Sequence, residues 1–412
     1  MQEVASESPK NRYQQIPLYI KILIAMLLGT VIGVFGKQMG MDPTKLKWIS
    51  DLVLRILRLL ATPLIFSAVL SSIVTAQVTG KKAGRLMFLL TTNSTVAILI
   101  GLLVANVLRP GDKLPPLVAD PALKDKVPYN IWNHLFESIP TDFISPFVKN
   151  DMISIIILAI VLGFGMRILI NSSNDQVSKS IRSLQNVLSA IFQLMITILK
   201  WVFELVPFAV FAVVAAVVAK NGVGSLLSMG LWIVSVVFAL LLMLVFYMIR
   251  LRLQSKISPV QFLRGGSDAF VMAFSTASSA ATLPVTYKCA TEKLGIKEDN
   301  ANLGIMVGGT FNHDGTALYE AMAALLVAQA MGQHLTFQQQ VIVVVMAMIA
   351  SVGAAGIPEA GLVTMIAVFS AVNLPIEFIA FLLPVDWFLD RCRTTINVMG
   401  DMTSTCILDA KD

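Results

Sequence analysis

Two short stretches near the C-terminus read GGTFNHDGT, at residues 308–316, and DRCRTTINVMGD, at residues 390–401. Each places ionisable side chains and glycine inside an otherwise apolar segment. An ionisable side chain in hydrocarbon costs about 2.5–3.5 kcal/mol on insertion scales, so such residues are expected to face a polar site. A single Asp–Arg pair that joins two helices would explain one such stretch but not two of the same form. We therefore interpret them as parts of one buried functional site.

Composition indicates a membrane protein. Of the 412 residues, 56% are apolar and only 14% are charged, whereas soluble domains carry about 25% charged residues. A soluble helical protein of this length would need amphipathic helices with polar outer faces, and the sequence suggests none. Apolar runs of about 20 residues, enough to cross a bilayer, recur along the chain. The clearest predicted spans are Ile16–Gly36, Leu52–Ala76, Leu86–Leu108, Ile153–Ile170, Ile196–Ala219 and Ser225–Leu251.

The net charge of +6 reflects topology rather than a nucleic-acid partner. Basic clusters lie before the first predicted span, between the second and third, and after the sixth. They share one side of the membrane if the N-terminus is cytoplasmic. The sequence thus predicts a multi-pass protein of the plasma membrane or cell inner membrane, with both termini cytoplasmic and the mixed-charge loop 109–130 outside. The clusters comprise Lys10, Arg12, Lys81, Lys82, Arg85, Arg250, Arg252 and Lys256.

Neither a leader nor a cofactor is predicted. The first fifteen residues are polar and precede a full-length span, so no cleaved signal peptide is expected. Cys289, Cys392 and Cys406 have neither metal-ligand spacing nor the pattern of a disulfide framework. We expect these cysteines to be small buried hydrophobic residues.

From about Ser258 the apolar segments become shorter, rich in glycine and interrupted. The segment FSTASSAATLP, residues 274–284, is too polar for a lipid-facing helix and ends in proline. The segment SVGAAGIP, residues 351–358, has the same form. We interpret each as the tip of a re-entrant hairpin, which is tolerated at membrane depth only where it is buried in protein or lines a wet cavity.

An internal repeat follows from these tips. After each tip comes a span that contains a Thr-x-Asn element, at residues 310–312 and 395–397, followed by Gly and Asp within four residues. The order is hairpin, broken helix, hairpin, broken helix, and paired interrupted segments of this kind mark the binding site of a transporter. Close helix packing through small residues is the alternative. It explains the glycines but not the charges.

The polar residues of the last span share one helical face, because they follow at steps of three and four. An Arg and an Asp one turn apart suit a zwitterion with a second acid group: the guanidinium binds a carboxylate bidentately and the Asp accepts from an ammonium. At Asn312–Asp314 we expect the helix to unwind and to free carbonyl oxygens for a small cation such as Na⁺. The polar face comprises Asp386, Asp390, Arg393, Thr394, Asn397 and Asp401.

These motifs resemble those of the glutamate/aspartate transporters of the dicarboxylate/amino acid:cation symporter family. The family's Asn-Met-Asp-Gly-Thr motif corresponds to residues 312–316. Its serine-rich first hairpin tip corresponds to residues 278–284, its second tip to 353–358, and its last span to 386–401. The association between paired interrupted segments and the binding site of a transporter is itself based partly on an archaeal homologue in this family.

The resemblance implies an all-α membrane protein with eight transmembrane helices, two re-entrant helical hairpins and inverted repeats. It implies a homotrimer whose protomers each work by an elevator movement. The implied division is a cytoplasmic segment at 1–15, scaffold helices 1–2 at 16–80, transport-domain helix 3 at 81–108, scaffold helices 4–5 with an extracellular loop at 109–224, and a transport-domain core at 225–412. That core would hold helix 6, hairpin 1, helix 7, hairpin 2 and helix 8.

The resemblance also assigns substrate ligands. Arg393 corresponds to the ligand of the substrate's side-chain carboxylate, Asp390 and Thr394 to the groups at its amino end, and Asn397 to a ligand of the α-carboxylate. The residues that would close the pocket are Ser278, Ser279, Thr316, Gly356 and Ile357.

Two sodium sites are implied in the same way. One would use Gly308, Asn312, Asn397 and Asp401. The other would use backbone carbonyls from Thr310, His313, Ser351, Val352 and Ala354.

Within the family, two positions discriminate between substrates. Relatives that move C4 dicarboxylates lack an Asp at the position of Asp390, and relatives that move neutral amino acids lack the Arg of Arg393. Since this chain keeps both, acidic amino acids, L-glutamate or L-aspartate, are favoured. Arg391, Ala277 and Glu320 resemble the animal-type branch, in which a glutamate at the position of Glu320 is the proton carrier.

Two departures from the family pattern concern the coupling ion. The sodium-binding Tyr-x-x-Thr-Ser of the third span corresponds to residues 90–94, where Leu90 replaces the tyrosine. A third sodium site, which would use Asn93, Ser94, Asn312 and Asp314, is therefore predicted to be weakened or absent. His313 replaces a methionine; either it fills the same volume, or it titrates near neutrality and exchanges a proton for a sodium alongside Glu320.

We predict a Na⁺-driven symporter of acidic amino acids, with H⁺ as a candidate second coupling ion. The alternatives are a proton-coupled symporter of acidic amino acids or dicarboxylates without sodium dependence, and an anion conductance as a side activity. An enzyme is not expected, because the sequence lacks HExxH and GxSxG motifs. Asp390 and Asp401 could imitate an aspartyl dyad, but they would lie about 16 Å apart on one helix.

Overall fold

The computed structural model describes residues 16–36, 38–75, 80–115, 136, 138–354, 356 and 358–410, and every regular element in that part of the chain is helical. Six helices there are long and apolar enough to cross a membrane. Large apolar side chains on the outer faces of several helices are exposed, as a lipid-facing surface requires. The six helical spans are Leu18–Phe35, Pro43–Thr75, Lys81–Leu108, Met152–Ile170, Asp175–Phe203 and Gly224–Gln254.

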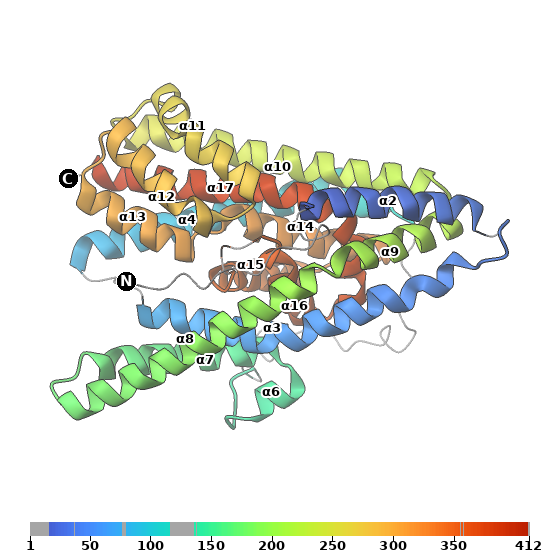
Figure 1. Ribbon diagram of the computed structural model, residues 1–412. Coiled ribbons are helices and arrows are strands. Elements are labelled where there is room, and N and C mark those ends of the chain that lie inside the picture. The colour runs from blue at the N-terminus through green and yellow to red at the C-terminus, as the bar shows by residue number, and fades with distance from the viewer. Residues whose placement is uncertain are drawn as a thin grey trace.

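The N-terminal helices pack against one another. Helix α2 (Leu18–Phe35) lies along α9 (Val206–Asn221), and α3 (Lys47–Thr75) contacts α7 (Met152–Ile170), α8 (Asp175–Phe203) and α9 (Figure 1). Small residues allow the close approach of α2 and α9: a Cβ at Gly29 would lie 2.8 Å from the Phe211 carbonyl oxygen. Gly33 is equally tight, because a Cβ there would lie 2.7 Å from the Val218 Cβ.

The predicted fifth span, Ile196–Ala219, is wrong in its bounds. The chain breaks inside it, at Glu204 and Leu205, because Pro207 in the first turn of α9 has no backbone N–H to donate. Helix α8 begins 21 residues earlier than the predicted span, at Asp175. Its N-terminal half is amphipathic, so the expectation that the chain has no amphipathic helix is also wrong.

Both predicted hairpins are present. In the first, α11 (Pro259–Thr276) turns at Ala277, which has a left-handed φ of 51°, into α12 (Ser279–Lys288). The Ser278 side chain caps α12 by accepting from the backbone N–H of Ala281 at 3.1 Å. In the second, α15 (Phe337–Val352) returns as α16 (Ala360–Ala371). The two tips meet, since the Ser278 hydroxyl donates to the Gly356 carbonyl oxygen at 2.8 Å.

One predicted helix break is confirmed and the other is wrong. Between α13 (Glu298–Phe311) and α14 (Asp314–Ala330) the chain leaves the helix at Asn312 and His313, as expected. By contrast, α17 (Leu383–Asp409) is one continuous helix through Gly400. The glycine there provides space rather than a break: a Cβ at Gly400 would lie 2.5 Å from the Asn312 side-chain nitrogen.

Helix α14 lies at the centre of the C-terminal half and is buried along its whole length. It contacts α4 (Gly80–Leu108), α15, α16 and α17. Helix α10 (Gly224–Gln254) runs beside α17, with the first hairpin at one end of the pair (Figure 1). Cys289 and Cys406 are buried and Cys392 is half-buried, and all three are free thiols. The remaining short elements are α6 (Ser145–Lys149), Pro43–Leu46, Pro110–Lys113, Cys289–Lys293 and Ile376–Phe381.

Candidate functional site

A small cavity lies where the two hairpin tips, the α13–α14 break and α17 meet. Its volume is about 10 Å³, close to the space that one water molecule needs. Of the predicted substrate ligands, the structure places Ser279, Thr316, Gly356, Asp390, Thr394 and Asn397 on its wall. Ser278 and Arg393 lie outside the lining, and Ile357 lies outside the described residues. The remaining lining residues are Ala277, His313, Ala354, Ala360 and Gly361.

Arg393 is the centre of a buried charge cluster behind this cavity. Its side chain is 0% exposed, and its Nη2 donates to Asp390 Oδ1 at 2.8 Å and contacts Asp386 Oδ1 at 3.1 Å. The guanidinium carbon lies 4.0 Å from the centre of the Tyr319 ring, a cation–π contact. Its Nε and Nη1 have no hydrogen-bond partner among the described residues. Each of these two nitrogens is therefore available for a charge-assisted hydrogen bond to a carboxylate.

Asp390 connects α17 to the second hairpin. Its Oδ1 accepts from Arg393, and its Oδ2 accepts the backbone N–H of Glu359 at 2.8 Å. Glu359 is a non-glycine residue with a left-handed φ of 62°, directly before α16. Its own side chain is buried, and Oε2 has no partner in the described chain. One carboxylate thus holds both the buried cation and the hairpin tip.

Asn397 fixes the start of α14. Its Oδ1 accepts the backbone N–H of Gly315 at 2.8 Å, and its Nδ2 donates to the Thr316 hydroxyl at 3.3 Å. The helices are close here, because a Cβ at Gly315 would lie 2.6 Å from the Arg393 carbonyl oxygen. Asn397 also lines the cavity. Its amide nitrogen has two hydrogens, so one remains for a ligand when the other is donated to Thr316.

The residues of the first predicted sodium site lie together. Asn312 Nδ2 donates to Asp401 Oδ1 at 3.0 Å and to the Asn397 carbonyl oxygen at 3.3 Å. A Cβ at Gly308 would lie 2.8 Å from Asp401 Oδ1, so only glycine fits. Asn312 Oδ1 is buried without a partner, and Asp401, itself buried, makes no ion pair with any described residue. A buried carboxylate without an ion-pair partner, beside an unpartnered amide oxygen, suits a small hard cation.

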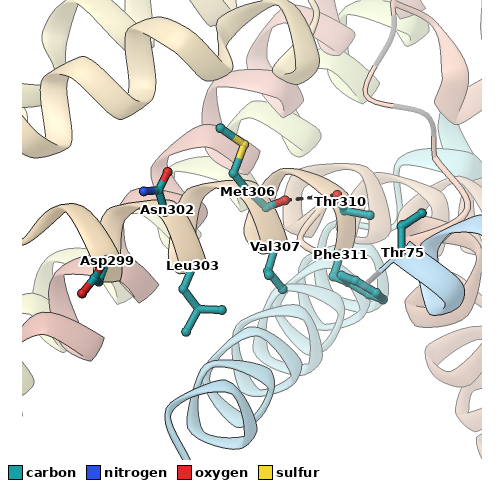
Figure 2. Close-up of a pocket in the computed structure, with 8 residues that line it drawn as sticks. All are labelled: Thr75, Asp299, Asn302, Leu303, Met306, Val307, Thr310 and Phe311. Carbon is teal, nitrogen blue, oxygen red and sulfur yellow. Dashed lines mark hydrogen bonds between the residues drawn. The ribbon is translucent and has the colours of Figure 1, made fainter. Parts of the chain in front are cut away.

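The residues of the second predicted set, which would bind through backbone carbonyls, lie at the α13–α14 break and around the end of α15. His313 and Ala354 line the small cavity, and Ser351 is buried at the end of α15. Neither ring nitrogen of His313 has a hydrogen-bond partner of good geometry in the described part of the chain. The Thr310 side chain instead lines a separate pocket of about 580 Å³ and donates to the Met306 carbonyl oxygen at 3.1 Å (Figure 2). Val352 ends α15 and does not line the small cavity.

Asp314, from the third predicted set, is enclosed by hydroxyl groups. Ser94 donates to its Oδ1 at 2.6 Å, and Tyr247 donates to its Oδ2 at 2.5 Å. Asn93 donates through Nδ2 to the Ser404 hydroxyl at 3.0 Å, and its Oδ1 accepts from Arg250 Nη1. Sequence reasoning missed Tyr247 and assigned Arg250 to a cytoplasmic basic cluster. The available signal was their spacing of three on α10, which places both on one helical face.

Glu320 lies between α14 and α16 rather than on the cavity wall. It is fully buried, and its Oε1 accepts from the Thr364 hydroxyl while Oε2 has no partner among the described residues. Thr364 was also missed, although its position one turn from Ala360 places it on the face of α16 that meets α14. Glu320 therefore joins the second hairpin to the central helix.

Comparison with known proteins identifies the family. The profile described as "Sodium:dicarboxylate symporter family" matches residues 18–411. A C4-dicarboxylate transport protein of Rhizobium leguminosarum is 30% identical, over 95% of this chain and 88% of its own. An excitatory amino acid transporter of Caenorhabditis elegans is 30% identical, over 93% of this chain and 85% of its own. A proton/sodium-glutamate symport protein of Bacillus subtilis is 29% identical, over 95% of this chain and 92% of its own.

These relatives are named as transporters, not as enzymes, which confirms the expectation that this chain is not an enzyme. The family and the apolar helices together establish a multi-pass membrane protein. The chain belongs to the sodium:dicarboxylate symporter family.

Proposed function

We propose that the protein is a secondary active symporter of acidic amino acids, L-glutamate or L-aspartate, driven by Na⁺. The observation that carries this proposal is the pair formed by Asp390 and Arg393 at the closed cavity. The names of the relatives divide between dicarboxylates and glutamate. A dicarboxylate has no ammonium group to bind a carboxylate, so Asp390 favours the amino acid.

Substrate binding would use groups that are free or exchangeable. The substrate's side-chain carboxylate would accept from Nε or Nη1 of Arg393, both of which lack partners in the described chain. Its ammonium would bind Asp390 beside Thr394, and its α-carboxylate would accept from Asn397 Nδ2. Each contact matches a charge or dipole on the substrate with its opposite on the protein.

Entry of the substrate requires the second hairpin to move, because a cavity of about 10 Å³ cannot hold an amino acid. Among the described residues, few hydrogen bonds hold the tip. Gly356 accepts from the Ser278 hydroxyl at 2.8 Å and from the Ala280 backbone N–H at 3.2 Å, and Glu359 donates to Asp390. An ammonium that took the place of the Glu359 N–H would compete with this closure, so binding and tip position are expected to be linked.

The helix contacts support the proposed division into a scaffold and a transport domain. Helices α2, α3, α7, α8 and α9 contact one another, whereas α4 packs on α10, α14 and α17. We propose that residues 16–80 and 109–224 form the scaffold and that 81–108 and 225–412 move as the transport domain. A homotrimer with an elevator movement, and cytoplasmic termini in a plasma or cell inner membrane, belong to this proposal.

Sodium is proposed to bind first at Asp401 with Asn312, Gly308 and Asn397, where a buried carboxylate lacks a cation. The second site would use carbonyl oxygens at the α13–α14 break and at the end of α15. Glu320 and His313 are the candidates for proton coupling. The competing function is proton-coupled transport of acidic amino acids or dicarboxylates, which the relatives' names also fit. An anion conductance would be a side activity.

The substrate class is tested by Asp390→Asn. We expect aspartate affinity to fall far more than succinate affinity, because only aspartate presents an ammonium. Removing one partner of a buried charge pair costs about 3–5 kcal/mol, roughly 100-fold or more in Kd. The measurement is competition with labelled aspartate on purified protein, with the exposed Asp268→Asn as the matched control. Equal losses for both ligands would show that Asp390 is structural only.

A further inference from the structure

Arg250 is an arginine buried in an apolar helix. It lies near the end of α10 and is only 6% exposed. Its Nη1 donates to Asn93 Oδ1 and, at 3.5 Å, to the Leu89 carbonyl oxygen. Its guanidinium carbon lies 5.6 Å from the centre of the Phe246 ring. A buried guanidinium needs compensation by a negative charge, yet Arg250 makes no direct ion pair with a described carboxylate.

The buried carboxylate linked to Arg250 through neighbouring residues is Asp314. Arg250 and Asp314 attract each other electrostatically, and Arg250 is the described cation that acts on this carboxylate. The polar contacts are continuous: Arg250 binds Asn93, the next residue Ser94 donates to Asp314, and Tyr247 from α10 donates to the other oxygen. Tyr247 and Arg250 are three residues apart and share one face of α10.

This arrangement does not fit a cation bound at Asp314. A sodium ion there would use oxygens from the predicted set, which comprises Asn93, Ser94, Asn312 and Asp314. The Asn93 oxygen, which would be one of these ligands, instead accepts from the Arg250 guanidinium. A second positive charge beside Arg250 would also be repelled in a medium of low dielectric constant.

The neighbouring carboxylate provides the contrast. Asp401 lies on the other side of Asn312, is equally buried, and has the Asn312 amide as its side-chain partner. No described Lys or Arg acts on it electrostatically. Two buried carboxylates therefore share one polar cluster, and among the described residues only Asp314 has a protein cation acting on it.

We propose that the Arg250 guanidinium is a built-in counter-charge that replaces a bound cation at the predicted site of Asn93, Ser94, Asn312 and Asp314. Because Arg250 takes the place of that cation, the transporter carries one cation fewer per substrate than it would if a cation could bind at this site. The statement about coupling rests on the proposed sodium dependence. The statement about the site itself depends only on the contacts of Arg250 and Asp314.

The experiment compares Arg250→Met with wild type. The apparent Kd for aspartate is measured on purified protein across Na⁺ concentrations, with choline replacing Na⁺ at constant ionic strength. The slope of log Kd against log [Na⁺] reports the number of sodium ions bound with the substrate. We expect a slope steeper by about one in Arg250→Met, because a sodium ion then fills the vacated site. An unchanged slope in the folded variant overturns the proposal.

Three further variants make the result specific. Arg252→Met, an exposed arginine on the same helix, is the matched control and should keep the wild-type slope. Arg250→Met combined with Asp314→Asn should return to that slope. Asp314→Asn alone, which also covers the case in which Arg250→Met does not fold, should leave the slope unchanged. A slope lower by about one in Asp314→Asn would show that this carboxylate holds a sodium ion and would overturn the proposal.

A second measurement separates this inference from the proposed function. The Tm is recorded against Na⁺ concentration without substrate, because an ion that binds only the folded state raises the Tm. If the wild type gives no sodium response but Arg250→Met gains one, sodium coupling fails and the inference stands. If neither responds, the inference is overturned.

Discussion

Replacing Arg393 by cysteine is expected to abolish the binding of aspartate and glutamate while leaving or creating binding of small neutral amino acids. Arg393 is fully buried, and its Nε and Nη1 have no partner among the described residues, so either can donate to a carboxylate of the substrate. Removing it leaves that carboxylate without a partner, at a cost of about 3–5 kcal/mol. Aspartate affinity should therefore fall by roughly 100-fold or more. The measurement is equilibrium binding of labelled aspartate and of serine to the purified variant.

The matched control is Arg391→Cys on the same helix. The Arg391 guanidinium lies over the rings of Tyr19 and Trp387 and donates to the Trp387 carbonyl oxygen at 2.8 Å, away from the cavity. This variant should retain aspartate binding within a small factor. Unchanged aspartate affinity in Arg393→Cys would remove the basis for assigning acidic amino acids as the substrate.

Asp401→Asn is expected to weaken substrate binding and to reduce its dependence on sodium. The amide retains the size of the carboxylate and a polar contact with Asn312, but it removes the formal negative charge from the proposed sodium site. We expect substrate affinity at fixed Na⁺ to fall by roughly 100-fold, about 2.7 kcal/mol. The slope of log Kd for aspartate against log [Na⁺] should become shallower by about one. The measurement is the same sodium titration of aspartate binding.

The matched control is Asp299→Asn, at an exposed position. It tests whether the loss of any carboxylate from this part of the protein is enough to change the sodium dependence of aspartate binding. It should keep the wild-type slope. If Asp401→Asn also keeps that slope, the sodium ion does not bind at Asp401, and the site has to be sought among the backbone carbonyls of the helix break.

The hairpins and the break at Asn312 could be predicted because polar small residues and proline interrupt apolar runs, which a lipid-facing helix does not tolerate. The continuity of α17 could not be predicted, because a glycine in the sequence is compatible both with a helix break and with the close approach of a neighbouring helix, as at Gly400. The start of helix α8 could not be predicted from apolar runs, because the first half of this helix is amphipathic and contains no continuous apolar run.

The candidate site was predictable where its residues follow one another on one face, as Asp386, Asp390 and Arg393 do on α17. It was not predictable where the partner comes from another helix. Arg250 near the end of a span fits the positive-inside bias as well as it fits a buried role. Only the fold places it beside Asn93, 157 residues away in the sequence.

The most direct test of the account is uptake of radiolabelled aspartate into proteoliposomes, with the Na⁺, H⁺ and K⁺ gradients varied one at a time. The account predicts saturable accumulation driven by an inward Na⁺ gradient, strong competition by glutamate and weak competition by succinate. Accumulation driven by a proton gradient alone, with an affinity that is independent of Na⁺ and falls as the pH rises, would contradict it.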